Sequence, residues 1–335
     1  MALISPPPNT LKTAPTHQQP RRCAVVFAYH NVGIRCLNML LAHDIDIALV
    51  ISHQDDAQET IWFESVPQRA AICGLPCITP DHPNQADLSE HIAAIAPDFI
   101  FSFYYRHMIP ASILATAKIG AFNMHGSLLP KYRGRAPVNW AILHGETQTG
   151  ATLHEMVIQP DAGAIIEQTA VPILPDDVAH EVFTKVCVAA ELTLWRALPA
   201  LISGHIQRLP NLLAQGQYFG ARKAEDGRIN WSHSARDIYN LYRAVAPPYY
   251  PGAFTEINTH RFIIAQAQRS PTPPALRHLN PHTDAGLHIV DQHIFGLCGD
   301  GQTLAITALT FQGQTVSPEQ LATLLALPSV ISHTL

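Results

Sequence analysis

The chain has 335 residues, of which 14% are charged, and a formal net charge of −5. This length is sufficient for two domains with a sizeable core, and the negative balance excludes a protein that binds nucleic acid through an overall basic charge. The spacing of the six cysteines fits neither a zinc site nor a Cys-x-x-Cys redox pair. We therefore expect reduced thiols, no metal and a cytoplasmic location.

The first 22 residues are rich in Pro, Thr and Gln and contain no apolar signal core. This composition predicts a flexible tail rather than a targeting segment. No apolar run of the chain reaches the roughly 18 residues that suggest a membrane span. We therefore expect no membrane-spanning segment.

Beyond the tail, short apolar runs alternate with helical stretches. The runs predict strands at residues 23–28, 45–51, 75–79, 98–103 and 119–124. The stretches between them predict helices at residues 33–42, 67–73 and 88–96. Strands that alternate with helices indicate an α/β, Rossmann-like fold with a mostly parallel sheet. Because such sheets bind ligands at the carboxyl ends of their strands, the segments after Phe103 and Met124 are where we expect the chemistry.

The second half of the chain begins with two predicted strands between residues 149 and 173, around a turn at residues 159–163. A long helix is predicted at residues 178–203 and a linker at residues 209–227. A helix at 235–246 and apolar runs at 254–265, 287–297 and 303–311 predict a smaller, β-rich, OB-like domain. The expected division is a tail (1–22), a catalytic domain (23–208) and a C-terminal domain (209–335).

Asn123 and His125 lie two residues apart at the end of a predicted strand, so their side chains point to the same side. An amide N–H can donate a hydrogen bond to a developing oxyanion, and an imidazole can transfer a proton, which together suit acyl transfer. An Asn and a His near a strand end are more often turn-forming residues. The pair alone therefore does not establish a site.

The segment GSLLPKYRGRAPVNWAILHGE follows His125 directly, and QPDAGAII comes later. Together with the Asn-x-His strand end, these segments resemble the folate-dependent formyltransferases, a family that includes methionyl-tRNA, glycinamide-ribonucleotide and amino-sugar formyltransferases. The resemblance implies that Asn123 stabilises the tetrahedral intermediate, that His125 transfers the proton and that Asp161 pairs with His125. It also implies 10-formyltetrahydrofolate as the co-substrate, without a metal.

The resemblance further implies a folate site built from three loops. Its expected residues are His107, Met108, Ile109, Arg135, Val157, Ile158, Gln159 and Pro160. An alternative for residues 107–109 is an ordinary connection between a strand and a helix. Arg133 and Arg135 are equally compatible with a solvated surface loop, although guanidinium groups there could hold carboxylates or phosphates.

The segments VVFAYHNVG, FIFSFYYRHMIP and RAVAPPYYPGAF are similar to the formyltransferase portion of enzymes that formylate UDP-4-amino-4-deoxy-L-arabinose. This similarity implies a nucleotide-sugar acceptor and a part in lipid A modification and polymyxin resistance. In those enzymes the portion is often fused to an NAD-dependent decarboxylase. We do not expect that second activity here, because no decarboxylase follows in this sequence.

Two other functions stay open at this point. Methionyl-tRNA formyltransferases also have an SLLP loop, but RGRAPVNW and FAYHNVG are typical of the sugar enzymes. Residues 211–335 carry eight Lys plus Arg against eight Asp plus Glu, without the basic excess expected of a tRNA-binding domain. A folate-binding protein without catalysis is disfavoured because Asn123, His125 and Asp161 are all present. The sequence predicts neither the nucleotide base nor the oligomeric state.

Overall fold

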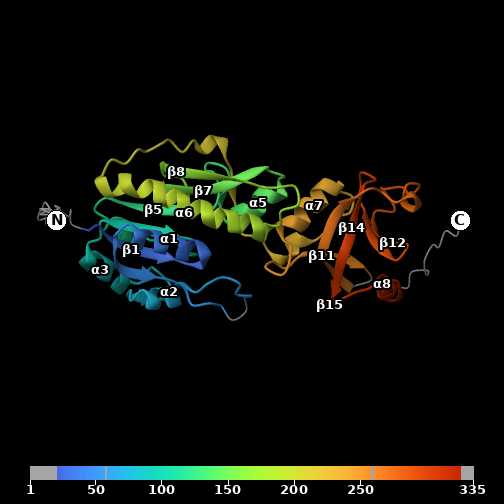
Figure 1. The fold of residues 1–335 in the computed structure, drawn as a ribbon, viewed down its shortest axis with the longest axis horizontal. Coiled ribbons are helices and arrows are strands. Elements are labelled where there is room, and N and C mark those ends of the chain that lie inside the picture. The colour runs from blue at the N-terminus through green and yellow to red at the C-terminus, as the bar shows by residue number, and fades with distance from the viewer. Residues whose placement is uncertain (1–20, 57–58, 258–259, 326–335) are drawn as a thin grey trace, which may run out of the picture.

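The computed structural model describes residues 21–56, 59–257 and 260–325. Most of the tail predicted for residues 1–22 therefore lies outside the described residues. Figure 1 shows two lobes along the long axis of the molecule, a larger one built around β1 to β8 and a smaller one built around β10 to β15.

The larger lobe contains a seven-stranded sheet with the order β3-β2-β1-β4-β5-β7-β8. Its strands are β1 (Cys23–Ala28), β2 (Asp46–Ile51), β3 (Cys77–Ile78), β4 (Phe99–Phe103), β5 (Gly120–His125), β7 (Gln148–Glu155) and β8 (Ile165–Pro172). Strands β1 to β5 are parallel to one another, whereas β7 is antiparallel to both β5 and β8. The predicted mostly parallel α/β sheet is confirmed.

Helices cover both faces of this sheet, which explains why its central strands are apolar throughout. In β1, Val25 and Phe27 join one core cluster while Ala24, Val26 and Ala28 join the other. The helices of this lobe are α1 (His30–Ala42), α2 (Val66–Ile72), α3 (Ala86–Ile95), α4 (Ala111–Leu114), α5 (Pro137–Leu143) and α6 (Ala179–Ser203). Alternate side chains of one strand thus pack on opposite layers of helices.

Helix α6 packs against α1, β7 and β8 and ends at Gly204, whose φ of 78° is the left-handed conformation that glycine adopts readily. By length and composition it is the one helix in the described part of the chain that could cross a membrane. Half of its apolar window is buried within the fold. Such burial is typical of a helix that belongs to a protein core.

The smaller lobe is an antiparallel sheet with the order β10-β11-β14-β13-β12, to which β15 adds by pairing with β14. Its elements are β10 (Ala253–Ile257), β11 (His260–Ser270), β12 (Gly286–Val290), β13 (His293–Leu297), β14 (Thr303–Phe311), β15 (Gln314–Thr315), α7 (Ala235–Ala244) and α8 (Pro318–Leu325). The predicted β-rich C-terminal domain is confirmed. Helix α7 contacts α5 of the larger lobe as well as β11 and β14.

The segment predicted as a linker, residues 209–227, has structure of its own. It contains the 3-10 helices η1 (Leu213–Gln215) and η2 (Ala224–Gly227) and the short strand β9 (Tyr218–Phe219). Strand β9 pairs in parallel with β6 (Arg133–Gly134), which follows the SLLP loop. The segment is thus attached to the larger lobe beside the predicted site, and a domain boundary at residue 208 stays a prediction.

Candidate active site

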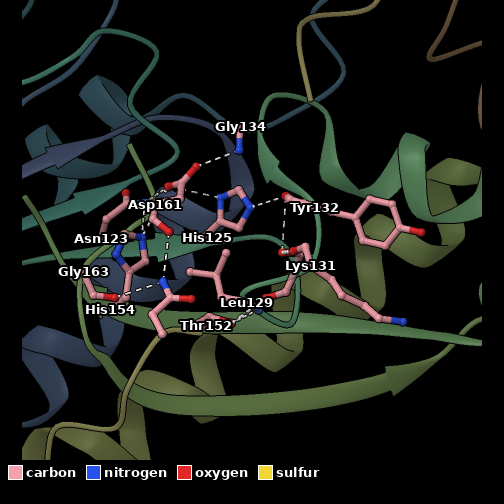
Figure 2. A network of polar contacts seen from close by, with 12 residues as sticks. Asn123, His125, Leu129, Lys131, Tyr132, Gly134, Thr152, His154, Asp161 and Gly163 are labelled. Carbon is pink, nitrogen blue, oxygen red and sulfur yellow. Dashed lines mark hydrogen bonds and ion pairs between the residues drawn. The ribbon is translucent and has the colours of Figure 1, made fainter. Parts of the chain in front are cut away.

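The three residues predicted for catalysis come together at one edge of the large sheet (Figure 2). Asn123 and His125 end β5, and Asp161 lies in the loop between β7 and β8. Nδ1 of His125 lies 3.6 Å from Oδ1 of Asp161, and Nδ2 of Asn123 lies 3.5 Å from the same oxygen. The His125 and Asp161 side chains are only 7% and 12% exposed, so these contacts are largely shielded from water.

The hydrogen bond at the far side of the His125 ring fixes where the ring can gain a proton. Nε2 of His125 lies 2.8 Å from the carbonyl oxygen of Tyr132. A carbonyl oxygen can only accept, so Nε2 carries the hydrogen in the neutral ring. The lone pair is then on Nδ1, which faces Asp161. A proton taken up by His125 therefore goes to Nδ1, where the carboxylate stabilises it.

The SLLP loop that supplies the Tyr132 carbonyl is tied to β7. The hydroxyl of Thr152 donates to the carbonyl of Ser127 at 2.6 Å and accepts the N–H of Leu129 at 3.1 Å. The hydroxyl of Ser127 in turn donates to the carbonyl of Lys131 at 2.6 Å. These hydrogen bonds hold the loop in the conformation that brings the Tyr132 carbonyl to the His125 ring.

Asp161 is held from several directions. Its Oδ2 accepts the N–H of Gly134 at 2.8 Å, and its φ of 52° is unusual for a residue with a side chain. Burial by itself would raise the pKa of Asp161. The neighbouring His125 and the N–H of Gly134 oppose burial, and the pKa of Asp161 lies well below its ordinary value. The carboxyl group is therefore charged at neutral pH.

Gly134 can reach Asp161 because of its place in β6. The N–H groups on either side of it donate to the carbonyls of Gln217 and Phe219 across the β6–β9 pair. Since successive N–H groups of a strand point in opposite directions, the N–H of Gly134 points away from β9 and towards Asp161. Its φ is 96°, and a Cβ there would lie 2.2 Å from the carbonyl oxygen of Phe219. The position requires glycine.

Two further residues contribute to the cluster without having been predicted. His154 on β7 lies opposite Asn123 in the β5–β7 ladder. Nδ1 of His154 lies 2.8 Å from the Glu155 carbonyl, so Nε2 is left to accept the Asn123 amide at 3.0 Å. The other residue is Asn211, whose amide donates to the carbonyls of Asp161 and Gly163, each at 3.0 Å.

No pattern in the sequence pointed to these two residues. His154 is one of 19 histidines, and its role depends on the register of an antiparallel pair. Asn211 lies 50 residues from Asp161 along the chain, inside the predicted linker. Asn211 is one of several polar residues in that segment, so its proximity to the loop of Asp161 could not be recognised from the sequence.

The residues predicted for folate lie on neighbouring loops. Arg135 donates to the carbonyl of Arg106 at 3.1 Å, directly before His107. Burial, His82 and the charge of Arg135 lower the pKa of His107. Ile109 is buried in the same cluster as Met156, which precedes the loop of residues 157–160. The structure thus brings Arg135 and both predicted folate loops to one region.

Several side chains of these loops are left uncovered. Met108 is 60% exposed, Val157 44% and Ile158 84%. Gln159 is also exposed, whereas Pro160 is half-buried and Ile109 is buried. Exposed apolar side chains of this kind are compatible with the contact to an aromatic ligand that the sequence predicts for these loops.

A cavity of about 620 Å³ opens next to the cluster. It is lined by side chains that follow β1 and β4, by the start of α5, by Phe183 of α6, and by the segments around residues 59–63 and 248–251. Its residues are Tyr29, His30, Glu59, Thr60, Trp62, Phe63, Tyr104, Arg106, Ala136, Pro137, Val138, Asn139, Phe183, Pro248, Tyr249, Tyr250 and Pro251. The Tyr104 hydroxyl lies against Gly126, the residue after His125. A Cβ added to Gly126 would lie only 1.9 Å from the hydroxyl oxygen. We name this cavity the aromatic pocket.

Within the described ranges, no group of three or more His, Cys, Asp or Glu side chains is arranged to hold a metal ion. All six cysteines are free thiols. The side chains that meet in the cluster are an amide, two imidazoles and a carboxylate.

Comparison with solved structures finds the same fold in sugar formyltransferases. An N-formyltransferase from Helicobacter canadensis, in complex with folinic acid and dTDP-3-aminofucose, is 19% identical, with a TM-score of 0.65 over 86% of this chain and 99% of that one. WlaRD, a sugar 3N-formyl transferase studied in the presence of dTDP and 5-N-formyl-THF, is 19% identical, with a TM-score of 0.65 over 88% and 100%. A sugar N-formyltransferase from a Shewanella species is 19% identical, with a TM-score of 0.58 over 72% and 95%.

Family models match the chain in both lobes. Residues 29–198 match the model described as formyl transferase, and residues 222–323 match the formyl transferase C-terminal domain. The first match alone spans about half of the chain. The chain therefore belongs to the formyl transferase family.

Proposed function

We propose that this enzyme transfers the formyl group of 10-formyltetrahydrofolate to the amine of a nucleotide-linked amino sugar. The observation that carries the proposal is the convergence of Asn123, His125 and Asp161 at the edge of the sheet, beside a pocket. These are the groups that formyl transfer to an amine needs: an oxyanion donor, a proton acceptor and a carboxylate that stabilises the protonated ring.

In this proposal the amine attacks the formyl carbon and its proton passes to Nδ1 of His125. Asp161 faces that atom and stabilises the imidazolium. Asn123 holds one amide hydrogen on His154, whereas its contact to Asp161 is long at 3.5 Å. The second hydrogen makes only this long contact, which it exchanges for one to the oxyanion. When the new C–N bond has formed and the bond to the folate nitrogen breaks, His125 returns the proton to that nitrogen.

The folate would lie on the loops that carry Met108, Arg135 and Ile158. Its contribution is the activated formyl group, and the role of this chain is to hold and orient it. The exposed apolar side chains suit its ring system, and Arg135 suits its carboxylates. Structures of similar fold were solved with folinic acid or 5-N-formyl-THF, which supports this assignment.

For the acceptor we propose UDP-4-amino-4-deoxy-L-arabinose, on the resemblance of FAYHNVG and RGRAPVNW to the enzymes that formylate it. An enzyme with this acceptor would take part in lipid A modification. Two proteins of similar fold are described with dTDP-3-aminofucose or dTDP. Those names support a nucleotide-linked sugar and make dTDP-linked amino sugars the first alternatives to test.

The test is to incubate the purified chain with 10-formyltetrahydrofolate and one candidate acceptor at a time. The panel contains UDP- and dTDP-linked amino sugars and charged initiator tRNA, and mass spectrometry detects the gain of one formyl group. We expect formylation of a nucleotide sugar that is lost in His125→Ala. Formylation of the tRNA alone, or folate binding without any formylated product, would overturn the proposal.

A further inference from the structure

The aromatic pocket contains a single basic side chain of the lysine or arginine type among its described lining residues, Arg106. Its guanidinium lies over the ring of Tyr29, 4.7 Å from the centroid. Nη1 of Arg106 lies 2.8 Å from both carboxylate oxygens of Glu59, which also lines the pocket. Both side chains of this ion pair are more than 40% exposed. The pocket thus contains a cationic side chain, Arg106, that is paired with the carboxylate of Glu59.

On residues that line the same pocket, two polar atoms have no hydrogen-bond partner within the described part of the chain. They are Nδ1 of His30 and the hydroxyl of Tyr104, both buried. His30 and Tyr104 follow β1 and β4, with φ values of 66° and 59°. Such conformations are uncommon for these residue types and tend to persist at binding sites. Buried polar atoms without partners indicate places where a ligand supplies the missing hydrogen bonds.

The charge state of His30 fits a neutral part of a ligand. Burial, with a further contribution from the charge of Arg106, lowers the pKa of His30 to about 3. The ring is therefore uncharged at neutral pH and offers one donor and one acceptor. Around it stand the rings of Trp62, Phe63 and Phe183. Aromatic walls with a few polar atoms suit a sugar or a base, whereas Arg106 suits an anion.

We propose that the aromatic pocket binds the nucleoside diphosphate of the acceptor and that Arg106 binds its phosphates. Glu59 pairs with Arg106 until the diphosphate displaces it. This inference rests on the proposed function, because it gives the acceptor its place. Guanidinium groups bind carboxylates and phosphates through the same paired donors. An exposed ion pair contributes little stability, so a diphosphate can displace Glu59 at low cost.

The proposal gives Arg106 and Glu59 opposite effects on nucleotide binding. Loss of the guanidinium in Arg106→Gln should weaken binding of a nucleoside diphosphate roughly ten- to a hundredfold, as expected for charged hydrogen bonds. Glu59→Gln removes the competing carboxylate and should strengthen the same binding severalfold. Neither change should alter binding of the nucleoside without phosphates.

Calorimetric titration of the full chain tests these expectations with UDP and dTDP, each compared with its nucleoside. Arg106→Lys keeps the charge without the paired donors and should give an intermediate affinity. Arg196→Gln, which removes an exposed guanidinium remote from the pocket lining, is the matched control and should bind as the unaltered chain does. Folinic acid binding, measured on every variant, shows that the variants are folded and reports on the folate site.

An unchanged preference for the diphosphate over the nucleoside in Arg106→Gln would overturn the inference. It would also fail if Arg106→Gln weakened folinic acid binding while leaving UDP and dTDP binding intact, because Arg106 would then serve the folate. The titrations need no turnover. Arg106-dependent binding without formyl transfer would contradict the proposed function alone, and formyl transfer with an unaltered KM in Arg106→Gln would contradict the inference alone.

Discussion

The cluster of Asn123, His125 and Asp161 and the aromatic pocket differ in whether their polar atoms have hydrogen-bond partners. His125 and Asp161 are bonded to protein atoms on both sides of each side chain. In the pocket, Nδ1 of His30 and the Tyr104 hydroxyl have no hydrogen-bond partner among the residues that the structure describes, and Arg106 is held by the exposed carboxylate of Glu59 and by the ring of Tyr29. The contacts of the cluster therefore fix the positions of its side chains without a ligand. In our proposal, the pocket gains polar partners when the acceptor binds.

This difference predicts that changes in the cluster act on turnover, whereas changes in the pocket act on binding. The predictions below test that division, starting with the largest effect.

Replacement of His125, the proposed proton-transfer group, gives the sharpest expected loss. His125→Ala should lower kcat by on the order of a hundredfold to ten-thousandfold, because general acid–base catalysis is lost. Steady-state formylation of the best acceptor measures it, and the exposed His205→Ala serves as the matched control. An effect on KM alone, with kcat unchanged, would show that His125 serves substrate binding rather than proton transfer.

A substitution at Gly134 tests whether the cluster depends on β6. Gly134→Ala puts a Cβ against the Phe219 carbonyl at a positive φ, so we expect a loss of about 1–3 kcal/mol in unfolding free energy together with a fall in kcat. Denaturant unfolding and kinetics measure the two effects. Gly220→Ala is the control, since a Cβ there meets nothing within 4 Å. Equal behaviour of the two variants would contradict the assigned role of β6.

The two regions should also differ in their response to acid. The pKa of His30 is lowered to about 3, so the unfolded chain gains a proton near pH 6.5 while the folded chain does not. Stability is therefore lost as the pH falls from 6.5 towards 3, by at most about 1.4 kcal/mol per pH unit for one group. The lowered pKa of Asp161 stabilises the fold above its ordinary value near 4, and this contribution is lost below it.

Unfolding measured between pH 7 and 3 separates these contributions. His30→Asn keeps a residue that tolerates positive φ and should flatten the upper part of the curve. Asp161→Asn should flatten only the part below about pH 4. If His30→Asn left the slope between pH 6.5 and 4 unchanged, His30 would not be the buried neutral group described here.

The smallest effect is expected at Asn211, which acts on the cluster through the backbone of the Asp161 loop. Asn211→Ala removes two hydrogen bonds, each worth about 0.5–1.5 kcal/mol, and should lower kcat by roughly tenfold or less without weakening folinic acid binding. Asn280→Ala in the smaller lobe is the control. A change in folinic acid binding without a change in kcat would move Asn211 to the folate site.

The elements that could be predicted from the sequence are those that depend on residues close together along the chain. The strand of residues 23–28 and the position of Asn123 and His125 at a strand end follow from short apolar runs, and the structure has them there. The run at 287–297 hid a hairpin because its turn, Asp291 and Gln292, takes positive φ without a glycine. The contacts of His154 and Asn211 could not be predicted, since they depend on strand register and on pairs distant in sequence.

The most direct test of the central claim is Asp161→Asn, which keeps the size of the side chain and removes its charge. Single-turnover formyl transfer and folinic acid binding are measured on the same preparation. We expect the transfer rate to fall by about a hundredfold or more, with folinic acid binding close to that of the unaltered chain. An unchanged rate, or a loss confined to folinic acid binding, would contradict the account.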